Sequence, residues 1–595
     1  MKKFQPLRRD KLLFPIIFFI LLLSVPMVLI YTPAILSKPV PHYPISSKTP
    51  LLNESNAYNY TFEISTQYKN REVCTTNNSL SASWFFSKLT GFGLQTFYQN
   101  FTVTLYSKPC KLINVFAIYP GKTDKFIIIS AQRDIAPTAE EGANNDGSGM
   151  GTLVELARVL RKVELNHTLI FLSVDAEEYG MLGARYFADN IENTDNFKNK
   201  NNVIAFISLN NMGEMWGEGI ELAGIGQQRG YIPLWFLSLI VDCANSLNVK
   251  TWFADSVLQY FERSVQVSLT DQGPFNRVDI PGVTFNAYIS DPAKKVYLDK
   301  ETYHLPGDNM SRISPFVLGF IGRTAELVVY SLDMLTERPS SSEPYVYLEP
   351  DKYMDASAIY FVCFYPFVPL LFYLVYMGYT LRKELNLRAI LREVLLIILS
   401  ALPLIFALTV SIPLQKTGVM TQFELYPPPP KAPYLYSVEI VPLAIIILTA
   451  LLTAIFFYLI WKKYLSKKLD TKMAFHSTKF TILLTFFFIL FITYIVNPYA
   501  ALVYLLPGSI TLLFIKEPYR WYWKIFNLSM VILSGVTLYI LIPQYAEFLE
   551  ISWTMLWYLI IIISTGLLPF ISVILFSLVF GIVVRCGKIG ILQKI

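Results

Sequence analysis

Long apolar stretches limit how this 595-residue chain can fold more than any other feature of its sequence. A transmembrane helix needs roughly 20 consecutive apolar residues. By that measure we expect about eight spans, at residues 12–30, 358–379, 394–413, 440–461, 480–496, 499–515, 525–542 and 555–584. With 53% hydrophobic and 16% charged residues, the chain is too apolar for a soluble multidomain protein. The sequence therefore predicts an integral membrane protein.

Basic residues next to the spans predict how the chain is oriented. Lys and Arg near span ends favour the cytoplasmic side. Lys2, Lys3, Arg8 and Arg9 precede the first span, and the basic loops at 382–392, 462–479, 516–524 and 585–588 follow at alternate turns. We expect a cytoplasmic N-terminus and anchor (1–46), an exterior or lumenal domain (47–353), and a membrane domain of about seven helices (354–595) with a cytoplasmic C-terminus. A cleaved signal peptide is the alternative for residues 12–30, although no clear small-residue cleavage site precedes Lys38.

The segment expected outside the membrane also carries six Asn-x-Ser/Thr sequons. Such sequons are glycosylated only outside the cytoplasm. They begin at Asn53, Asn59, Asn77, Asn100, Asn166 and Asn309. Any one of them can arise by chance in an Asn-rich sequence, but together they agree with a glycosylated exterior domain. In the same segment Cys74 and Cys110 could pair, which would leave Cys243 over.

Within this exterior segment, short β-rich runs alternate with amphipathic stretches. The strand candidates are residues 112–118, 126–131, 168–174, 203–209 and 282–286, and a helix with Ser148 as its N-cap is expected over 150–163. This alternation predicts an α/β domain with a mixed, mainly parallel sheet flanked by helices. In such folds the carboxyl ends of the strands form the site. We therefore expect the loops that carry Gln132, Asn145, Glu177, Asn211 and His304 to cluster there.

The residues in these loops follow an ordered pattern. Gln132-Arg133-Asp134 comes first, then a glycine-rich run with Asn145 and Asp146, the pair Glu177-Glu178, Asn211, Asp271-Gln272-Gly273-Pro274-Phe275, and His304 with Asp308. Over roughly residues 60–335 this pattern resembles the zinc aminopeptidase family, which includes leucyl aminopeptidases and the single-zinc glutaminyl cyclases. The resemblance implies an aminopeptidase-like fold.

The same resemblance implies a degenerate metal site. In the family, the positions of Gln132, Asn145 and Asn211 hold one zinc, and those of Asn145, Glu178 and His304 hold the other. Zinc prefers imidazole, thiolate or carboxylate ligands, and three of these positions are neutral amides here. Asp146 would substitute for Asn145 only if the loop were slipped by one residue. We expect no zinc, or one weakly bound zinc.

Three further positions take their expected roles from the family. Glu177 matches the general base, which has little to do without a metal to acidify its water. Glu177 could then be structural, bonded to a backbone amide or to Arg133. Asp134 matches a residue that orients the metal ligand at position 132. Gln272 replaces a usual histidine, which bears on the substrate cleft more than on metal.

The arrangement of spans around such a domain resembles two membrane groups. These are the endoplasmic-reticulum metallopeptidases, whose zinc motifs are intact, and the aminopeptidase-like subunit of glycosylphosphatidylinositol transamidase, whose zinc pattern is degenerate. We favour a non-catalytic peptide-binding or scaffold subunit of a membrane complex. The alternatives are an active single-zinc metallo-aminopeptidase or cyclotransferase acting on exterior peptides, and a purely structural assembly protein. The expected partners are membrane lipid, a peptide or protein terminus in the cleft and other membrane subunits, with no nucleic acid.

Overall fold

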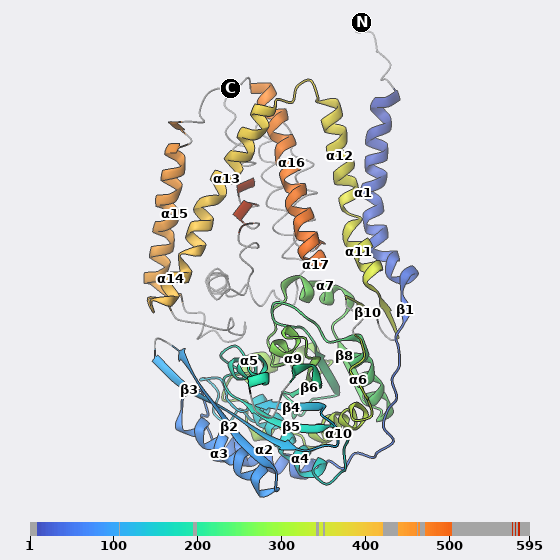
Figure 1. Cartoon of the computed structure of the whole chain (residues 1–595), viewed down its shortest axis with the longest axis vertical. Coiled ribbons are helices and arrows are strands. Elements are labelled where there is room, and N and C mark those ends of the chain that lie inside the picture. The colour runs from blue at the N-terminus through green and yellow to red at the C-terminus, as the bar shows by residue number, and fades with distance from the viewer. Residues whose placement is uncertain are drawn as a thin grey trace. The chain divides into compact units, whose positions relative to one another are not determined.

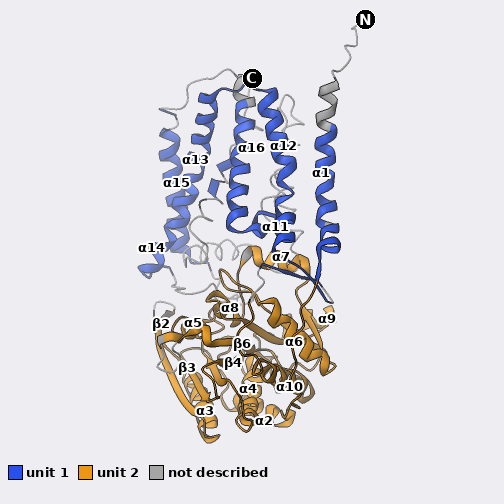
Figure 2. Cartoon of the chain, turned by 45° about the vertical axis from the view of Figure 1, so that its right-hand side comes forward, with its two compact units in different colours: residues 1–38, 344–420, 438–595 blue, residues 39–343, 421–437 orange. Residues whose placement is uncertain are grey.

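The computed structural model describes two compact units (Figure 2). The described residues are 9–105, 108–193, 199–340, 344–348, 351–420, 438–460, 462–463, 471–502, 574, 577–578 and 581–582. An α/β unit lies within residues 39–343, and a helical unit combines residues up to 38 with residues after 343. The predicted span at 525–542, and most of those at 499–515 and 555–584, lie outside the described residues.

An eight-stranded sheet of mixed direction forms the centre of the α/β unit (Figure 1). Its strand order is β2-β3-β5-β4-β6-β9-β7-β8. The strands are β2 (Gln95–Leu105), β3 (Lys108–Tyr119), β4 (Phe126–Gln132), β5 (Thr168–Val174), β6 (Val203–Leu209), β7 (Gly219–Ala223), β8 (Lys250–Phe253) and β9 (Gly282–Tyr288). The pairs β4/β5, β4/β6, β6/β9 and β7/β8 are parallel, and β2/β3, β3/β5 and β7/β9 are antiparallel. The predicted mixed, mainly parallel sheet is confirmed.

Helices cover both sides of this sheet (Figures 1 and 2). On one side lie α2 (Glu54–Gln67), α4 (Gly149–Leu160) and α10 (Pro315–Leu332), and on the other α5 (Leu182–Asp189) and α8 (Gln272–Arg277). The remaining helices of the unit are α3 (Thr76–Gly91), α6 (Leu234–Ser246), α7 (Ser256–Val265) and α9 (Pro292–Glu301), with short turns η1 (Ala143–Ser148), η2 (Ile191–Asn193), η3 (Lys200–Asn202) and η4 (Met310–Arg312). Every residue of β5 and β6 is buried, as is typical of strands covered on both faces.

The strand predictions agree with the structure to within a few residues, but the predicted cap of α4 is wrong. Ser148 stands at the N-cap position, yet its hydroxyl donates to Asn144 O at 2.7 Å and accepts from Met212 N at 2.8 Å. The carboxylate of Asp146 accepts a hydrogen bond from Gly149 N at 2.9 Å. A carboxylate two residues before the expected cap therefore serves the start of α4.

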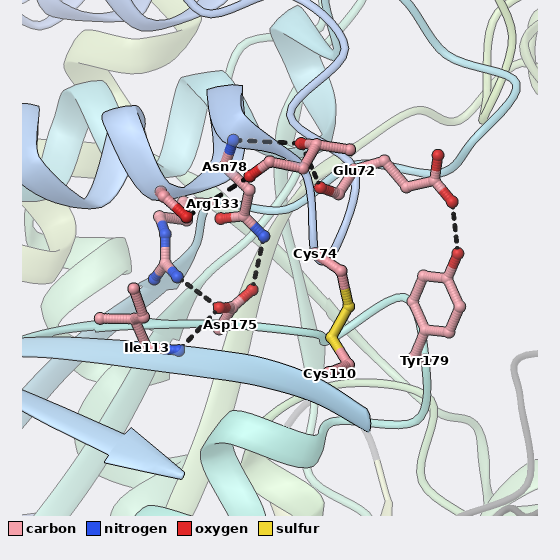
Figure 3. The surroundings of a disulfide bond; sticks show 10 residues. Glu72, Cys74, Asn78, Cys110, Ile113, Arg133, Asp175 and Tyr179 are labelled. Atoms are coloured by element: carbon pink, nitrogen blue, oxygen red, sulfur yellow. Dashed lines mark hydrogen bonds and ion pairs between the residues drawn. A yellow bond between two sulfur atoms is a disulfide. The ribbon is translucent and has the colours of Figure 1, made fainter. Parts of the chain in front are cut away.

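A disulfide between Cys74 and Cys110 ties the segment before α3 to strand β3 (Figure 3). The structure thus forms the pair that the sequence allowed, and it leaves Cys243 as a buried free thiol. Close by, Tyr179 donates to Glu72 Oε1 at 2.7 Å. Disulfides persist in oxidising compartments, so this bond agrees with an exterior or lumenal location.

The helical unit contains long apolar helices. They are α1 (Arg9–Leu36), α11 (Ala356–Phe364), α12 (Phe367–Thr380), α13 (Leu387–Thr409), α14 (Ser411–Lys416), α15 (Ile440–Ile460), α16 (Thr471–Val496) and α17 (Pro498–Ala500), together with the short strands β1 (Lys38–Pro39), β10 (Val346–Leu348) and β11 (Lys352–Met354). Side chains of α12 and α16 form a buried apolar core that includes Phe367, Leu370, Leu483 and Phe486.

Five helices of the described chain are long and apolar enough to cross a membrane. Four of these segments (356–380, 387–416, 440–460 and 477–496) coincide with predicted spans. The fifth is α10, whose apolar window is 78% buried and which packs against α2, α6 and strands of the α/β unit. Burial within that unit explains the apolar composition of α10.

Candidate active site

The carboxyl ends of the three central parallel strands carry the polar residues singled out in the sequence. Gln132 is the last residue of β4, Glu177 and Glu178 follow β5, and Asn211 follows β6. Because parallel strands end at the same edge of a sheet, the fold brings these side chains close together. Asn145 joins them from η1 and His304 from the loop after α9.

The carboxylate of Glu178 lies at the centre of this cluster. Asn145 Nδ2 donates to Glu178 Oε1 at 2.7 Å, and Gln132 Nε2 approaches the same oxygen at 3.3 Å. His304 Nε2 lies 2.9 Å from Glu178 Oε2, and both side chains are at most 5% exposed. Two amide N–H groups and a ring nitrogen of His304 therefore surround a buried carboxylate.

Two other carboxylates hold the backbone of these loops in place. Asp134 accepts from Glu177 N at 3.0 Å and from Glu178 N at 3.1 Å. Asp308 accepts from Asn144 N at 2.7 Å and from Asn145 N at 2.9 Å. Asp134 was expected to orient the side chain at position 132, but in this structure it fixes the acidic pair instead.

Burial shifts the pKa of both carboxylates upward. The pKa of Asp134 rises to about 7, mainly through burial and then through Asp175 and Glu178, although its backbone donors act in the opposite direction. Burial likewise raises the pKa of Asp308 to about 6. Both carboxyl groups thus titrate close to neutral pH.

The structure turns Asn145, and not Asp146, toward Glu178. Asp146 is fully buried, and its Oδ1 accepts from Gly149 N at 2.9 Å and from Asn211 N at 3.3 Å. Its Oδ2 has no hydrogen-bond partner among the residues that the structure describes. Asp146 therefore does not take the place of Asn145 next to Glu178.

The remaining amides bond to one another. Asn210 Nδ2 approaches Gln132 Oε1 at 3.4 Å, and Asn144 Nδ2 approaches Asn211 Oδ1 at 3.3 Å. Asn211 and His304 both have a positive φ, 50° and 62°, which residues other than glycine adopt rarely and which recurs at functional sites.

Glu177 differs from its neighbour because its carboxyl group makes no hydrogen bond or ion pair with a described residue. It is only 4% exposed. Burial, followed by the charges of Glu178 and Asp271, raises the pKa of Glu177 well above its ordinary range.

The alternative in which Glu177 bonds Arg133 is wrong, because Arg133 points away from the cluster. Arg133 Nη2 pairs with Asp175 Oδ2 at 2.6 Å, and Asn78 Nδ2 donates to Asp175 Oδ1 at 2.8 Å (Figure 3). The Glu177 carboxyl group thus has no bond to Arg133.

Comparison with known proteins agrees with this arrangement. Residues 114–329 match the model of peptidase family M28. The match lies within the α/β unit, and we use the names M28 domain and M28 site for the matched region and its polar cluster. Every motif described above, from Gln132 to Asp308, lies within that range, including the central carboxylate Glu178.

The chain also aligns with individual known proteins over part of its length. It is 25% identical over 239 residues to aminopeptidase YwaD of Bacillus subtilis, covering 38% of this chain and 46% of the relative. It is 30% identical over 161 residues to leucine aminopeptidase 1 of Pyrenophora tritici-repentis, covering 24% and 41%. A solved zinc aminopeptidase from Bacillus subtilis aligns with a TM-score of 0.40 and 15% identity over 48% of this chain and 96% of that one. The chain thus spans less than half the length of these two curated relatives.

Arg71 supports the loops of the M28 site through hydrogen bonds. It lies outside the motifs, and the sequence analysis did not identify it. Its buried guanidinium donates to Arg133 O and to Gly142 O, both at 2.7 Å, and also to Glu141 O. Burial lowers the pKa of Arg71 to about 10. No sequence signal marks this arginine, because it lies far from the loop it supports.

Gln272 was expected to line the substrate cleft, and the structure places it in the interior instead. Its side chain is fully buried. Nε2 donates to Ile225 O at 3.1 Å and to Ser268 Oγ at 3.0 Å, while Oε1 accepts from Thr284 Oγ1 at 2.6 Å. With its amide satisfied by protein groups, Gln272 links loops behind the site.

The side chains of the M28 site do not fit a zinc ion. Only Glu178 and His304 are suitable ligands there, and the third position presents the Nδ2 donor of Asn145 to Glu178. Among the described residues, no three His, Cys, Asp or Glu side chains are placed to hold a metal. Because an N–H group cannot donate an electron pair to zinc, a bound ion would require these side chains to turn.

Proposed function

We propose that this M28 domain binds a peptide or protein terminus without hydrolysing it, as a binding or scaffold subunit of a membrane complex. The observation that carries the proposal is the bonding of Glu178. The amide N–H groups of Asn145 and Gln132 point at its carboxylate, and the ring nitrogen Nε2 of His304 lies 2.9 Å from it. In a zinc peptidase that carboxylate would be satisfied by the cation.

The charge balance of the site supports the same function. Replacing a carboxylate with an amide removes one negative charge at each of Asn145 and Asn211, so the loops can pack without a divalent cation between them. The unbonded, buried carboxyl group of Glu177 supplies a polar contact for a terminus. Without a metal-bound water it has no acidic water to deprotonate.

The long apolar helices support a place in a membrane complex. The four spans of the helical unit would hold the M28 domain beside a lipid surface. Membrane lipid and other membrane subunits are therefore the partners we propose besides the peptide.

Metal content and peptide binding together test this function. We expect full-length protein in detergent, dialysed against trace zinc, to hold well under one zinc per chain and still to bind short fluorescent peptides. It should release no amino acid from them. Stoichiometric zinc with hydrolysis would instead identify the single-zinc peptidase, and failure to bind any peptide would leave a purely structural role.

The triple variant Gln132→His, Asn145→Asp, Asn211→Asp provides a positive control. It restores the ligand types that the family uses at these three positions. Zinc binding by this variant, but not by the natural chain, would show that the fold of the site is intact and that the side chains alone prevent metal binding.

A further inference from the structure

A group of aromatic rings surrounds α9 on the surface of the α/β unit. Trp252 on β8 and Tyr288 on β9 stack with their ring centroids 6.1 Å apart. Trp216, which precedes β7, and Tyr297 on α9 form a second pair with ring centroids 5.6 Å apart. All four rings remain at least partly accessible to solvent. The β8 end of the sheet thus presents indole and phenol groups on its surface.

Two lysines of α9 connect these ring pairs. Lys295 Nζ lies 5.2 Å from the ring centroid of Tyr288 and 5.7 Å from that of Trp252. Lys294 Nζ lies 5.6 Å from the ring centroid of Trp216. Neither lysine forms an ion pair with a residue in the described part of the chain, so both ammonium groups can donate to an anionic group of a ligand. We name α9 and the rings beside it the α9 face.

The α9 face also exposes apolar side chains. No residue of α9 is buried. Val296 is 43% exposed, and Met215 and Tyr297 are each 47% exposed. Tryptophan, tyrosine and lysine side chains that lie together on a surface are typical of the membrane–water interface, where an apolar body and a polar tip meet different surroundings.

The charges of α9 indicate the depth at which such contact occurs. Half of its ten residues are charged, so the helix cannot enter the hydrocarbon layer. Asp299 and Glu301 offset two of its three lysines. The α9 face is therefore not a strongly basic patch, and it suits zwitterionic phospholipid headgroups, which carry a phosphate and no net charge.

Chain connectivity keeps the α/β unit close to lipid. The apolar helix α1 ends at Leu36, and the α/β unit begins at Pro39. On the other side, the unit reaches Glu343, and the apolar helix α11 begins at Ala356. Two short connectors therefore hold this unit near a bilayer surface, which raises the effective concentration of headgroups around it.

We propose that the α9 face lies in the phospholipid headgroup layer of the membrane that anchors the chain. The rings of Trp216 and Tyr297 pack between headgroups, and Lys294 and Lys295 donate to phosphate oxygens. This contact is independent of peptide binding at the M28 site. It gives the α/β unit a second attachment to the bilayer in addition to its connectors.

A fluorophore on α9 tests this contact. The full chain, with Cys243, Cys363 and Cys586 changed to alanine, carries Val296→Cys labelled with a nitrobenzoxadiazole dye. It is reconstituted in phosphatidylcholine nanodiscs with or without lipid that bears a nitroxide on its headgroup, which quenches the dye only at short range. We expect the label to lose about half of its fluorescence to this lipid, as a position at headgroup level would.

The matched position for the label is Leu80→Cys on α3. Leu80 is also an exposed apolar residue, at 48%, and α3 packs on β2 and β3 at the opposite end of the sheet from β8. In the same nanodiscs this label should lose little fluorescence. The comparison separates contact of the α9 face from general proximity to the bilayer.

The double variant Met215→Ser, Tyr297→Ser should reduce the quenching at position 296 about twofold, because it removes apolar surface that would contact headgroups. Both side chains are exposed, so the fold does not depend on them. The control variant Phe62→Ser, Met334→Ser makes the same kind of change at side chains that are 47% and 51% exposed. It should leave the quenching unchanged, and thermal melting would verify that the variants are folded.

The phosphate contact has a separate test in Lys294→Gln, Lys295→Gln, which removes both charges and keeps most of each side chain. This variant should also reduce the quenching. Equal quenching of the labels at positions 296 and 80 would overturn the inference, and so would quenching that neither double variant reduces. If the α9 face instead binds another membrane subunit, the label at position 296 would remain unquenched in the purified chain.

Discussion

The side-chain amide of Asn145 donates a hydrogen bond of 2.7 Å to the buried carboxylate of Glu178. The resemblance to the M28 family implies a metal-bridging carboxylate at this position, and two carboxylates at this distance repel each other unless a cation lies between them. The amide removes that repulsion and adds an attraction. At position 145, an amide therefore favours the stability of the metal-free protein, whereas a carboxylate would favour metal binding.

The variant Asn145→Asp tests this opposition directly. Without zinc, we expect it to lower the melting temperature, because it places a second carboxylate against Glu178. With zinc, it completes a three-ligand site with Glu178 and His304, and zinc affinity should rise at least tenfold, about 1.4 kcal/mol. Melting curves with and without chelator measure both effects.

The control for this variant is Asn201→Asp, which makes the same change at an exposed position. It should alter neither the melting temperature nor its response to zinc. If Asn145→Asp gains no zinc affinity, the assignment of Asn145 to the bridging position must be withdrawn.

Removing His304 should destabilise the protein even when no metal is present. His304 lies 2.9 Å from Glu178, and both side chains are nearly inaccessible to solvent. His304→Ala leaves a buried carboxylate with one partner fewer, which costs about 1–3 kcal/mol. In the background of Glu178→Gln the same change should cost less, because no charge is left uncompensated.

The surface pair His42 and Asp242 gives a matched comparison. It has the same separation of 2.9 Å, but the His42 side chain is 68% exposed. His42→Ala should cost about 0–1 kcal/mol. If His304→Ala costs no more than His42→Ala in the presence of chelator, the buried contact contributes nothing to stability.

Much of this fold follows directly from the sequence because its central strands are buried on both faces. Residues 168–174 and 203–209 are mostly apolar, and the structure forms β5 and β6 over the same ranges. The site residues lie at the ends of these strands, so their clustering follows from topology.

Contacts that depend on the direction of a side chain could not be predicted from the sequence. The hydroxyl of Ser148 bonds to Asn144 instead of capping α4, and Gln272 turns into the interior. Arg71 donates to backbone carbonyl groups of the site. Because every residue type carries such a carbonyl, no sequence pattern identifies this contact.

The buried carboxyl group of Glu262, which lies outside the M28 site, should make the stability of the protein depend on pH. Burial raises the pKa of Glu262 to about 7, whereas an unfolded glutamate titrates near about 4.3. The folded state therefore holds a proton that the unfolded chain has released. The stability that this bound proton contributes is fully present below about pH 4 and is lost as the pH rises through about 7.

Glu262→Gln should flatten this dependence while it keeps the acceptor for the Tyr231 hydroxyl, which donates at 2.5 Å. Between pH 5 and 8 we expect the natural protein to lose on the order of 1–3 kcal/mol relative to the variant. Melting temperatures across this range provide the measurement, with Glu301→Gln as the exposed control. Parallel curves for the natural protein and Glu262→Gln would show that Glu262 is ionised throughout.

The alternating basic loops predict that residues 47–353 lie outside the cytoplasm and that both termini lie inside it. Protease added to sealed vesicles should remove the M28 domain and spare a tag placed after Ile595. Digestion of that tag while the membrane is intact would mean that an odd number of spans has been miscounted.

The six sequons should differ in how fully they are glycosylated, because the sugar is attached to the side-chain nitrogen of Asn. Asn59 and Asn100 are exposed, and no hydrogen bond to a described residue uses their side-chain nitrogens. In contrast, Asn77 Nδ2 donates to Lys69 O at 2.6 Å, and Asn166 Nδ2 donates to Asp333 O at 3.1 Å. We expect Asn59→Gln and Asn100→Gln each to remove one glycan from the mature protein, as seen by electrophoretic mobility and mass spectrometry. The matched changes Asn77→Gln and Asn166→Gln should remove little or no glycan.

Full occupancy at Asn77 would show that the modification precedes formation of its bond to Lys69, and a complete lack of glycan at all six sites would argue against a lumenal or exterior domain.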